Sequence, residues 1–332
     1  MEKRTLGSTG IAVSAVSFGA GPVSQLLVGD RHDVQRETIR RAVELGVNWF
    51  DTAATYGEGR SEENLGRSLA ELGVQSRVHV ATKIRIMPDR LADIAAAARE
   101  SLLASLGRLR LARVTLLQIH NSITACAGAE PTSITPAHVL GSGGLVEELE
   151  RLRRDGLVEH LGLTGLGEPG ALVEVIASGA FASIQIPHNL LNPSAGRAMP
   201  AGFDQTDYGN LIDVCRRRGM GVFAIRVLAG GALAGKPPSP HTLKTPYFPL
   251  ELYRQDCARA ERIAGLLPPD IGREEAAVRF VLSHPAITSA IIGFATPDEV
   301  DQVVRFASRG PLDPKLLATL DEHALTSHGP SP

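Results

Sequence analysis

Four residues whose side chains can give or take a proton stand just beyond short, mostly apolar segments. They are Asp51, with Tyr56 shortly after it, Lys83 and His120. If the preceding segments are parallel strands standing side by side, their carboxyl ends open on one face of the protein. An acid, a phenol, an amine and an imidazole would then meet there. A pocket that gathers these groups is equipped for proton transfer.

Each of the four residues has an ordinary explanation when it is taken alone. The carboxylate could shape a turn, the phenol could lie on the surface, the amine could be solvated, and the imidazole could be an interior side chain with satisfied hydrogen bonds. Together they are harder to dismiss, because the three segments that carry them follow one another along the chain. Ionisable groups clustered beside apolar strand ends are costly unless a function uses them.

The elements that position these residues follow one repeated pattern of a short apolar strand, a loop and an amphipathic helix. A β-hairpin is expected over residues 4–13. Eight strands are expected at residues 14–19, 47–50, 78–83, 114–119, 158–164, 182–186, 221–227 and 288–292. The helices are expected at residues 33–45, 61–73, 89–109, 145–155, 170–178, 208–218, 252–266 with 273–283, and 297–307. The hydroxyl of Ser61 is expected to cap the second helix.

Eight uninterrupted strand-and-helix units indicate parallel crossovers, in either a closed barrel or an open doubly wound sheet. The barrel is favoured because no G-x-G-x-x-G follows the first strand, where Pro22 stands instead, and because the polar strand ends are spread over many units. We therefore predict an α/β fold, a (β/α)8 TIM barrel formed as a single domain by residues 1–332. Three long connections at residues 121–144, 187–207 and 229–250 follow strands, on the face where barrels carry their sites.

Composition excludes several classes of function. The 332 residues are 43% hydrophobic and 21% charged with a net charge of −2, which is typical of a globular protein without a nucleic-acid partner. The basic run Arg216–Arg218 is better explained as a helix end. No segment resembles a signal peptide or a membrane span, and no metal-ligand spacing is present. The three cysteines are far apart and odd in number, which does not fit a disulfide framework and favours the cytoplasm. The sequence leaves the oligomeric state open.

Four stretches of the chain resemble the aldo-keto reductase family, and the match runs nearly end to end. The stretches are Phe50-Asp51-Thr52-Ala53, Tyr56 through Gly66, Ala81-Thr82-Lys83 and Gln118-Ile119-His120. The resemblance implies an NAD(P)-dependent oxidoreductase that interconverts a small-molecule carbonyl compound (an aldehyde, a ketone or an aldose) and an alcohol. It also implies that the family's catalytic tetrad falls on Asp51, Tyr56, Lys83 and His120.

The same resemblance implies a site for the nicotinamide cofactor. The residues that it assigns run from the nicotinamide to the adenosine: Thr164 and Gln185 at the carboxamide, Arg226, Leu228 and Gly230 at the pyrophosphate, and Gly293, Thr296 and Gln302 at the adenosine. The residue types suit the reaction. The nicotinamide would supply a hydride and Tyr56 a proton. A free phenol has a pKa of about 10, so the ammonium of Lys83, held by Asp51, would be needed to stabilise the phenolate. His120 would donate to the substrate oxygen.

The chain departs from the family pattern at three places. Gly165 replaces a usual asparagine, and Ile225-Arg226-Val227 replaces an aromatic, a serine and a proline, which removes a ring expected to stack on the nicotinamide. Arg226 would either neutralise an anion, in the cofactor or the substrate, or face solvent. Residues 294–296 lack the cation that pairs with the 2′-phosphate of NADP. The cofactor is therefore NADP(H) or NAD(H), and we expect weak discrimination or a preference for NAD(H).

Two other functions fit the residues. One is a barrel lyase in which Lys83 forms a Schiff base with a carbonyl substrate. The other is a non-catalytic sensor that binds the cofactor and a protein partner, against which the complete set of four proton-transfer residues argues. Low aromatic content favours a polar, sugar-like substrate.

Overall fold

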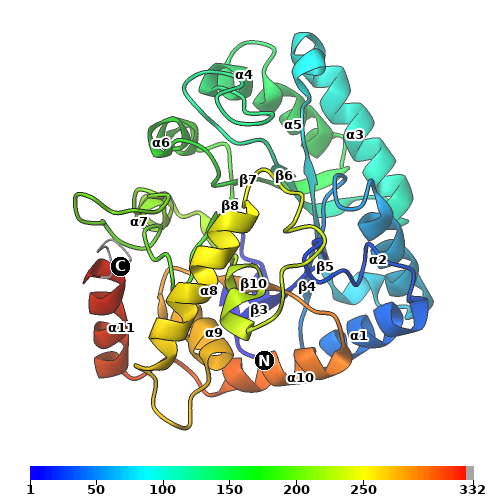
Figure 1. Ribbon diagram of the computed structural model, residues 1–332. Helices are drawn as coiled ribbons and strands as arrows, with labels where there is room; N and C mark the ends of the chain where they lie inside the picture. The colour runs from blue at the N-terminus through cyan, green and yellow to red at the C-terminus, as the bar shows by residue number, and fades with distance from the viewer. Residues whose placement is uncertain (327–332) are drawn as a thin grey trace.

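Eight parallel strands close into a barrel in the computed structural model, which describes residues 1–326 (Figure 1). Around the barrel the strands run β10-β3-β4-β5-β6-β7-β8-β9. Their bounds are β3 (Val16–Gly19), β4 (Trp49–Asp51), β5 (His79–Ile84), β6 (Val114–Ile119), β7 (Val158–Thr164), β8 (Ser183–Pro187), β9 (Gly221–Ile225) and β10 (Ser289–Gly293). The predicted (β/α)8 barrel is confirmed.

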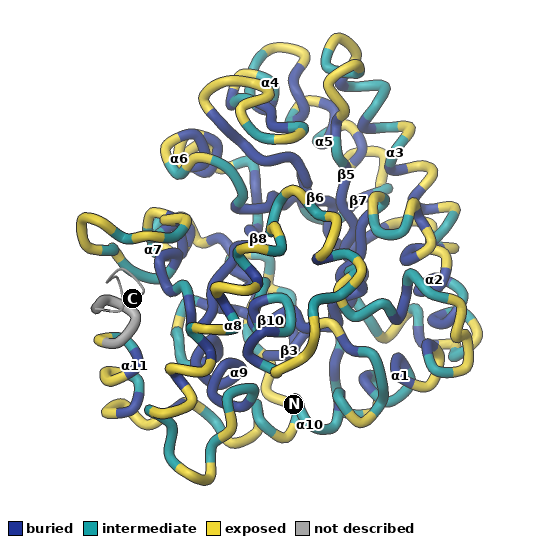
Figure 2. Tube along the Cα trace, viewed as in Figure 1, coloured by how far each residue is buried: buried dark blue, intermediate teal, exposed yellow. Residues whose placement is uncertain are grey.

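Helices surround the strands and bury one face each against them, so the barrel wall is enclosed while the outer helix faces remain exposed (Figure 2). They are α1 (His32–Glu44), α2 (Arg60–Glu71), α3 (Ile94–Leu109), α5 (Leu145–Arg154), α6 (Pro169–Ala177), α7 (Leu211–Arg217), α8 (Leu250–Ala264), α9 (Arg273–Ser283) and α10 (Pro297–Ser308). In α5, for example, Leu145, Leu149 and Leu152 recur at helical spacing and are buried. No helix in the described part of the chain has both the length and the apolar character needed to cross a membrane.

Several boundaries differ from those expected from the sequence. The helix expected from residue 89 begins at Ile94, because Pro88 opens a 3-10 helix, η2 (Pro88–Asp93). Ser61 does not cap α2. Its hydroxyl binds the carbonyl of Ala20 and the hydroxyl of Thr52 instead, and the residue before the helix is Gly59 in a left-handed conformation. Further short elements are α4 (Pro136–Leu140), η1 (Gln75–Arg77), η3 (Ala229–Ala234) and the C-terminal α11 (Pro314–Thr326).

The expected N-terminal hairpin is present, and it covers one end of the barrel. Its strands are β1 (Lys3–Thr5) and β2 (Ala12–Ser14). Leu6, at the turn, is fully buried and packs with interior residues of the barrel. Gly7 has a positive φ, and a Cβ there would lie 2.4 Å from the backbone of Gly219, so this close approach requires glycine. The open end of the barrel is therefore the one where the strands finish.

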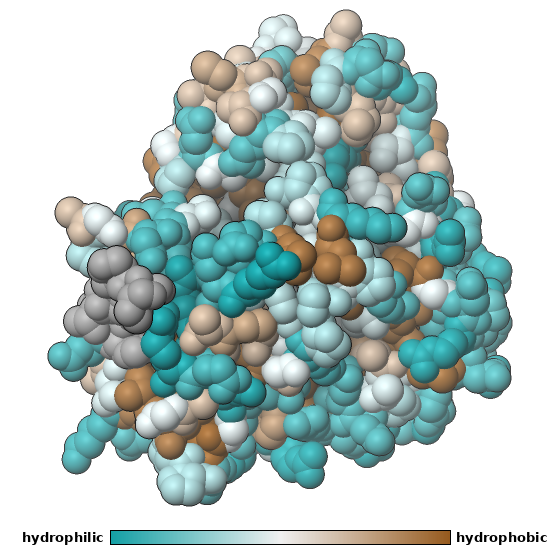
Figure 3. Space-filling model, viewed as in Figure 1, coloured by the Kyte–Doolittle hydropathy of each residue, from teal (hydrophilic) through white to brown (hydrophobic). Residues whose placement is uncertain are grey.

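The barrel interior is layered. Next to the hairpin lies an apolar layer that includes Trp49, Ala81, Leu116 and Phe223. Because side chains alternate along a strand, the residues two positions later point to the same interior. On β4, β5 and β6 these are Asp51, Lys83 and Gln118, so a polar layer lies directly above the apolar one. On the molecular face drawn in Figure 3, hydrophobic residues form separate groups among hydrophilic ones.

Candidate active site

A cleft of about 890 Å³ opens at the carboxyl ends of the strands. Asp51, Tyr56, Lys83 and His120 all line it, so the four residues predicted to meet do lie together. Residues from the long connection 229–250 form part of the rim, including Tyr247 and Phe248. The cleft is therefore built from strand ends at its base and from loops at its rim.

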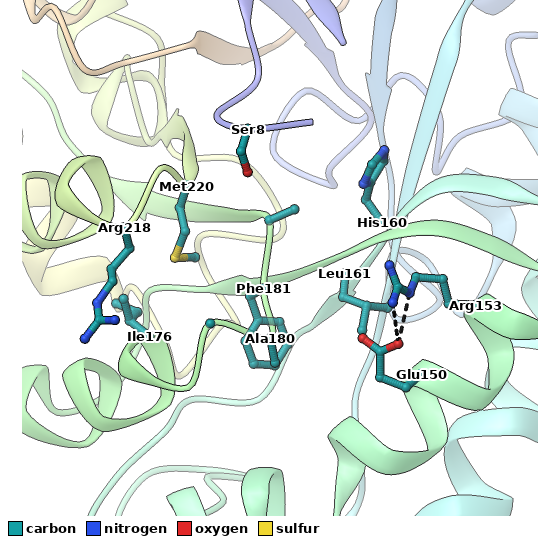
Figure 4. Close-up of a pocket in the computed structure, with 12 residues that line it drawn as sticks. Ser8, Glu150, Arg153, His160, Leu161, Ile176, Ala180, Phe181, Arg218 and Met220 are labelled. Carbon is teal, nitrogen blue, oxygen red and sulfur yellow. Dashed lines mark hydrogen bonds and ion pairs between the residues drawn. The ribbon is translucent and has the colours of Figure 1, made fainter. Parts of the chain in front are cut away.

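A second cavity of about 240 Å³ lies at the other end of the barrel, where strands β7 and β9 begin (Figure 4). Two of the charged side chains that line it, Glu150 and Arg153, form an ion pair with each other at 2.7 Å. None of the four predicted residues lines it. The large cleft is therefore the candidate active site.

Asp51 and Lys83 form a buried ion pair at the base of the cleft. Lys83 Nζ lies 2.5 Å from Asp51 Oδ1, and the two side chains are 1% and 4% exposed. Lys83 also donates to the carbonyl oxygen of Thr52 at 2.9 Å. Burial by itself would lower the pKa of Lys83, but the charge of Asp51 and the neighbouring Tyr56 more than offset it and raise that pKa. The lysine is thus held as a cation.

The second carboxylate oxygen of Asp51 accepts hydrogen bonds from two side-chain amides. Gln118 Nε2 donates to it at 3.0 Å, and Gln185 Nε2 donates to the same atom. Register explains the convergence: Lys83 lies beside Gln118 across β5 and β6, and both side chains follow the inward alternation. The carboxylate is therefore fixed by three neighbours and cannot turn away from Lys83.

Tyr56 completes the chain of contacts from the carboxylate to the cleft. Lys83 Nζ donates to Tyr56 Oη at 3.3 Å. The two ends of the loop that carries Tyr56 are joined by a hydrogen bond between the hydroxyls of Thr52 and Ser61, which are 2.8 Å apart. A left-handed Gly57 then turns the chain into α2. The phenol thus faces the cleft with a cation directly behind its oxygen.

His120 stands edge-on to the Tyr56 ring, with the ring centroids 5.6 Å apart. Its Nδ1 lies 3.3 Å from the hydroxyl oxygen of Thr55. Burial, together with the positive charges of Lys83 and Arg85, lowers the pKa of His120 well below its ordinary value. The imidazole is therefore neutral near pH 7, and Nε2 can donate a hydrogen bond when Nδ1 accepts one from Thr55.

Six of the eight residues that the family resemblance assigns to the cofactor line the cleft: Thr164, Gln185, Arg226, Leu228, Gly230 and Gly293. The other two are engaged elsewhere. Thr296 caps the start of α10 by accepting from the backbone N–H of Glu299, and Gln302 donates to Glu274. Neither of them is part of the cleft wall.

Arg226 is packed into the wall of the cleft, and its side chain is only 16% exposed. It donates to Asp256 Oδ2 at 3.1 Å, and its guanidinium lies 4.1 Å from the centre of the Phe248 ring. Burial lowers the pKa of Arg226, which Asp256 partly offsets. The alternative in which this arginine faces solvent is wrong. An incoming phosphate would compete with Asp256 for this guanidinium.

The cleft wall fits a nicotinamide dinucleotide in several respects. Glycines line it along the neighbouring ends of β9, β10 and β3, at Gly230, Gly293, Gly19 and Gly21, so that backbone is accessible to a ligand there. The departure at Gly165 also has a physical reason. A Cβ there would lie 3.0–3.1 Å from the side chains of Ile184 and Ile186, which leaves little room for an asparagine.

Four residues of this site were not predicted from the sequence: Gln118, Arg85, Glu299 and Lys236. Two of them had a usable signal. Gln118 stands two positions before His120, and Arg85 stands two positions after Lys83, so strand alternation places each on the cleft side. Glu299 and Lys236 are distant in sequence, and their ion pair at 2.6 Å depends on how α10 and the loop after β9 pack.

Comparisons with known proteins agree with the barrel fold. The model of the Aldo/keto reductase family matches residues 29–325. L-galactose dehydrogenase of Arabidopsis thaliana is 27% identical, across 92% of this chain and 87% of its own length. A Schizosaccharomyces pombe protein named for the voltage-gated potassium channel subunit beta is 26% identical, across 96% and 92%. The holo form of aldo-keto reductase AKR11C1 from Bacillus halodurans superposes with a TM-score of 0.72 at 20% identity, across 97% and 96%.

Proposed function

This chain belongs to the Aldo/keto reductase family, and from that premise we propose that it interconverts a carbonyl compound and an alcohol with Tyr56 as the proton donor and acceptor. Membership and the dehydrogenase relative support nicotinamide-dependent oxidoreduction in general. The observation that supports the role of Tyr56 is its hydrogen bond to Lys83, a buried cation that Asp51 holds in place. Asp51, Lys83 and His120 complete the proposed catalytic set.

In the reducing direction the substrate carbonyl accepts a hydride at carbon and a proton at oxygen, which gives the alcohol and the oxidised cofactor. The bound nicotinamide supplies the hydride. Tyr56 donates the proton to the carbonyl oxygen and is left as a phenolate beside the ammonium of Lys83, which stabilises the negative charge. The phenolate then regains a proton from water. Neutral His120 donates a hydrogen bond to the same substrate oxygen and orients the carbonyl.

Thr164, Gln185, Arg226, Leu228, Gly230 and Gly293 are proposed to hold the cofactor, with Thr296 acting through the helix start that it caps and Gln302 through its hydrogen bond to Glu274. The expected preference is weak, or tilted to NAD(H). Glu299 supports this part of the proposal because it lines the cleft beside residues 293–296 and accepts from the backbone N–H of Ala295 at 2.7 Å. A carboxylate can accept a hydrogen bond from a ribose hydroxyl but repels a 2′-phosphate. The nearby Lys236 is already paired with Glu299.

The Schiff-base lyase is less well supported. A lysine that attacks a carbonyl must be neutral and must have a free lone pair. Lys83 is buried, its pKa is raised, and it donates hydrogen bonds to Asp51, Thr52 and Tyr56. Borohydride trapping distinguishes the two functions, because covalent capture of substrate at Lys83 would support the lyase.

The sensor function has one observation in its favour, the relative named for a potassium channel subunit. The complete network from Asp51 to Tyr56 argues for catalysis, because a protein that only binds the cofactor has no need of a phenol placed against a buried cation. Turnover measurements decide between them.

Tyr56→Phe tests the proposal. The variant keeps the ring and its packing but removes the proton, so we expect cofactor binding within about twofold of wild type and a loss of turnover of about 10²- to 10⁴-fold. Binding is followed by fluorescence titration and turnover by absorbance of the reduced nicotinamide. Tyr208→Phe is the matched control, because Tyr208 is buried and does not line the cleft. A near-normal kcat in Tyr56→Phe would remove Tyr56 from the mechanism.

A further inference from the structure

Arg85 is a cation in the cleft wall that the proposed mechanism does not use. It follows β5, two positions beyond Lys83, and its guanidinium lies beside His120, whose backbone carbonyl it approaches at 3.5 Å. In the barrel order β5 stands four strands from β9, which carries Arg226 at its end. Arg85 is therefore across the barrel from the predicted pyrophosphate residues, on the side of the cleft where His120 and Tyr56 stand.

The charge of Arg85 is not balanced by the protein in the way that its neighbours are. Of the four other lysines and arginines that line the cleft, three have carboxylate partners: Lys83 with Asp51 at 2.5 Å, Arg226 with Asp256 at 3.1 Å, and Lys236 with Glu299 at 2.6 Å. The fourth, Lys244, is exposed to solvent. Within residues 1–326 no carboxylate forms an ion pair with Arg85, and its buried Nε has no hydrogen-bond partner. A cation without a counter-ion in a partly buried wall is costly, which indicates a site for an anion from outside. Because Nε is enclosed, that anion would bind at the Nη groups.

An aromatic ring covers this guanidinium. The centre of the Tyr247 ring lies 4.8 Å from Arg85 Cζ. Tyr247 is itself fixed, because its hydroxyl oxygen is 3.0 Å from Thr132 Oγ1 and donates to the carbonyl of Pro131 at 3.1 Å. The ring keeps water from one face of the cation and leaves its edge, where the N–H groups point, for an anion. A shielded guanidinium binds an anion more strongly than one in water.

We infer that Arg85 anchors a carboxylate of the substrate, so that the preferred substrates are carbonyl acids such as aldehyde acids and uronic acids, or the matching hydroxy acids. This inference rests on the proposed function and names the substrate class of the same site. The planar fork of one guanidinium matches one carboxylate. The carbonyl at the other end of the substrate then lies toward Tyr56 and His120, where it accepts hydride and proton as described above. Arg85 is a specificity residue, since it binds a part of the substrate that does not react.

Matched substrate pairs test the inference in the cofactor-loaded protein. Succinic semialdehyde is compared with its methyl ester, and D-glucuronate with D-glucose, so that each pair differs in the carboxylate alone. We expect wild type to prefer the acid in kcat/KM by at least about tenfold. In Arg85→Gln the acid should lose about 10- to 100-fold, mainly through KM, as expected for a charge-assisted hydrogen bond. The neutral partner should change less than about threefold. Arg85→Lys should retain part of the preference.

Lys244→Gln is the matched control, because Lys244 is another cation of the cleft wall but lies at its exposed rim. Its acid-to-ester ratio should change by less than about twofold. Thermal unfolding and cofactor titration verify that each variant folds. Equal use of acid and neutral substrates by wild type, or equal losses for both in Arg85→Gln, would overturn the inference while leaving the proposed function intact.

A binding measurement separates the two proposals further. Succinate, which carries the anion but no carbonyl, should bind the cofactor-loaded wild type in calorimetry and bind at least about tenfold more weakly to Arg85→Gln. If no aldehyde is turned over at all, the proposed function fails, and succinate binding alone then decides whether Arg85 is an anion site. Equal succinate binding by both proteins would refute that site.

Discussion

Three of the four proposed catalytic residues, Asp51, Lys83 and Tyr56, form one hydrogen-bonded unit, and His120 contacts it through the Tyr56 ring. Asp51 accepts from Lys83, Gln118 and Gln185, and Lys83 donates to Asp51, Thr52 and Tyr56. Every donor of the ammonium is therefore used, and both carboxylate oxygens are satisfied. Removing one partner would leave the other as an uncompensated buried charge, which is far more costly than a lost surface ion pair.

Glu299 is the residue on which the proposed cofactor preference depends. Glu299→Gln removes the carboxylate charge and frees Lys236, whose ammonium can then pair with a 2′-phosphate. We expect the ratio of kcat/KM for NADPH to that for NADH to rise about 3- to 10-fold, because a repelling carboxylate is removed while solvent screens the half-exposed Lys236. Initial rates with both cofactors at one ionic strength give this ratio.

Asp298→Asn provides the control for Glu299→Gln. Asp298 is an exposed carboxylate in the same first turn of α10 and does not line the cleft, so its removal should leave the cofactor ratio unchanged within about twofold. A wild-type protein that already prefers NADPH strongly would contradict the proposed preference, whatever the variants do.

Single residues differed in how far the sequence could place them. The positions of Asp51, Lys83 and His120 follow from the ends of apolar strands, and the alternation of side chains extends the argument to Gln118 and Arg85. Strand alternation could not predict whether Thr296 and Gln302 face the cleft. Thr296 precedes α10 and Gln302 lies within it, and the rotation of that helix is set by packing. The partner of Arg226 could not be predicted either, because Asp256 lies in α8, which is distant in sequence.

At the scale of elements, helix α2 carries the packing constraint closest to the site. It begins just after Tyr56 and rests against the end of α3. Gly66 makes this possible, because a Cβ on it would lie 2.5 Å from the carbonyl carbon and oxygen of Leu109. The sequence predicted both helices, but it gave no sign that Gly66 is a contact residue rather than a weak point within α2.

Two glycine substitutions test this packing with opposite signs. Gly66→Ala forces the two helices apart, and we expect the free energy of unfolding to fall by about 1–3 kcal/mol. Gly107 lies in α3, and a Cβ added there would have nothing within 4 Å. In Gly107→Ala the better helix propensity of alanine should therefore raise the free energy of unfolding by about 0.5–1 kcal/mol. Urea unfolding followed by circular dichroism measures both. Changes of the same sign would show that α2 and α3 do not pack as described.

At the scale of the whole molecule, barrel closure brings together residues that are far apart in the chain. Asp51 and Gln185 come from β4 and β8, on opposite sides of the barrel order, yet they share a hydrogen bond. The repeated strand-and-helix pattern was enough to predict this closure, because eight parallel crossovers without a switch in direction favour a barrel. That residues 1–332 form a single domain stays a prediction.

The whole fold should also be sensitive to acid through a buried imidazole. His188 follows β8 and is 3% exposed; its ring stacks on Phe280 of α9 with centroids 5.5 Å apart, and its Nδ1 has no partner among the described residues. Burial, with the nearby charges of His284 and Arg197, lowers the pKa of His188 to about 3. The side chain therefore joins two elements of the barrel wall only in its neutral form.

The sign of the pH effect follows from proton binding. Above pH 6.5 His188 is neutral in both states and has no effect, whereas between pH 6.5 and about 3 the unfolded chain binds a proton that the folded protein does not. The free energy of unfolding should therefore decrease as the pH is lowered through this window, by up to about 5 kcal/mol from His188 alone. In His188→Phe, which keeps a ring against Phe280, the slope of unfolding free energy against pH should be smaller. His32→Gln, at an exposed histidine, should retain the wild-type slope. If His188→Phe and wild type lose equal stability as the pH is lowered from 6.5 to 4, protonation of His188 is not the cause of the loss.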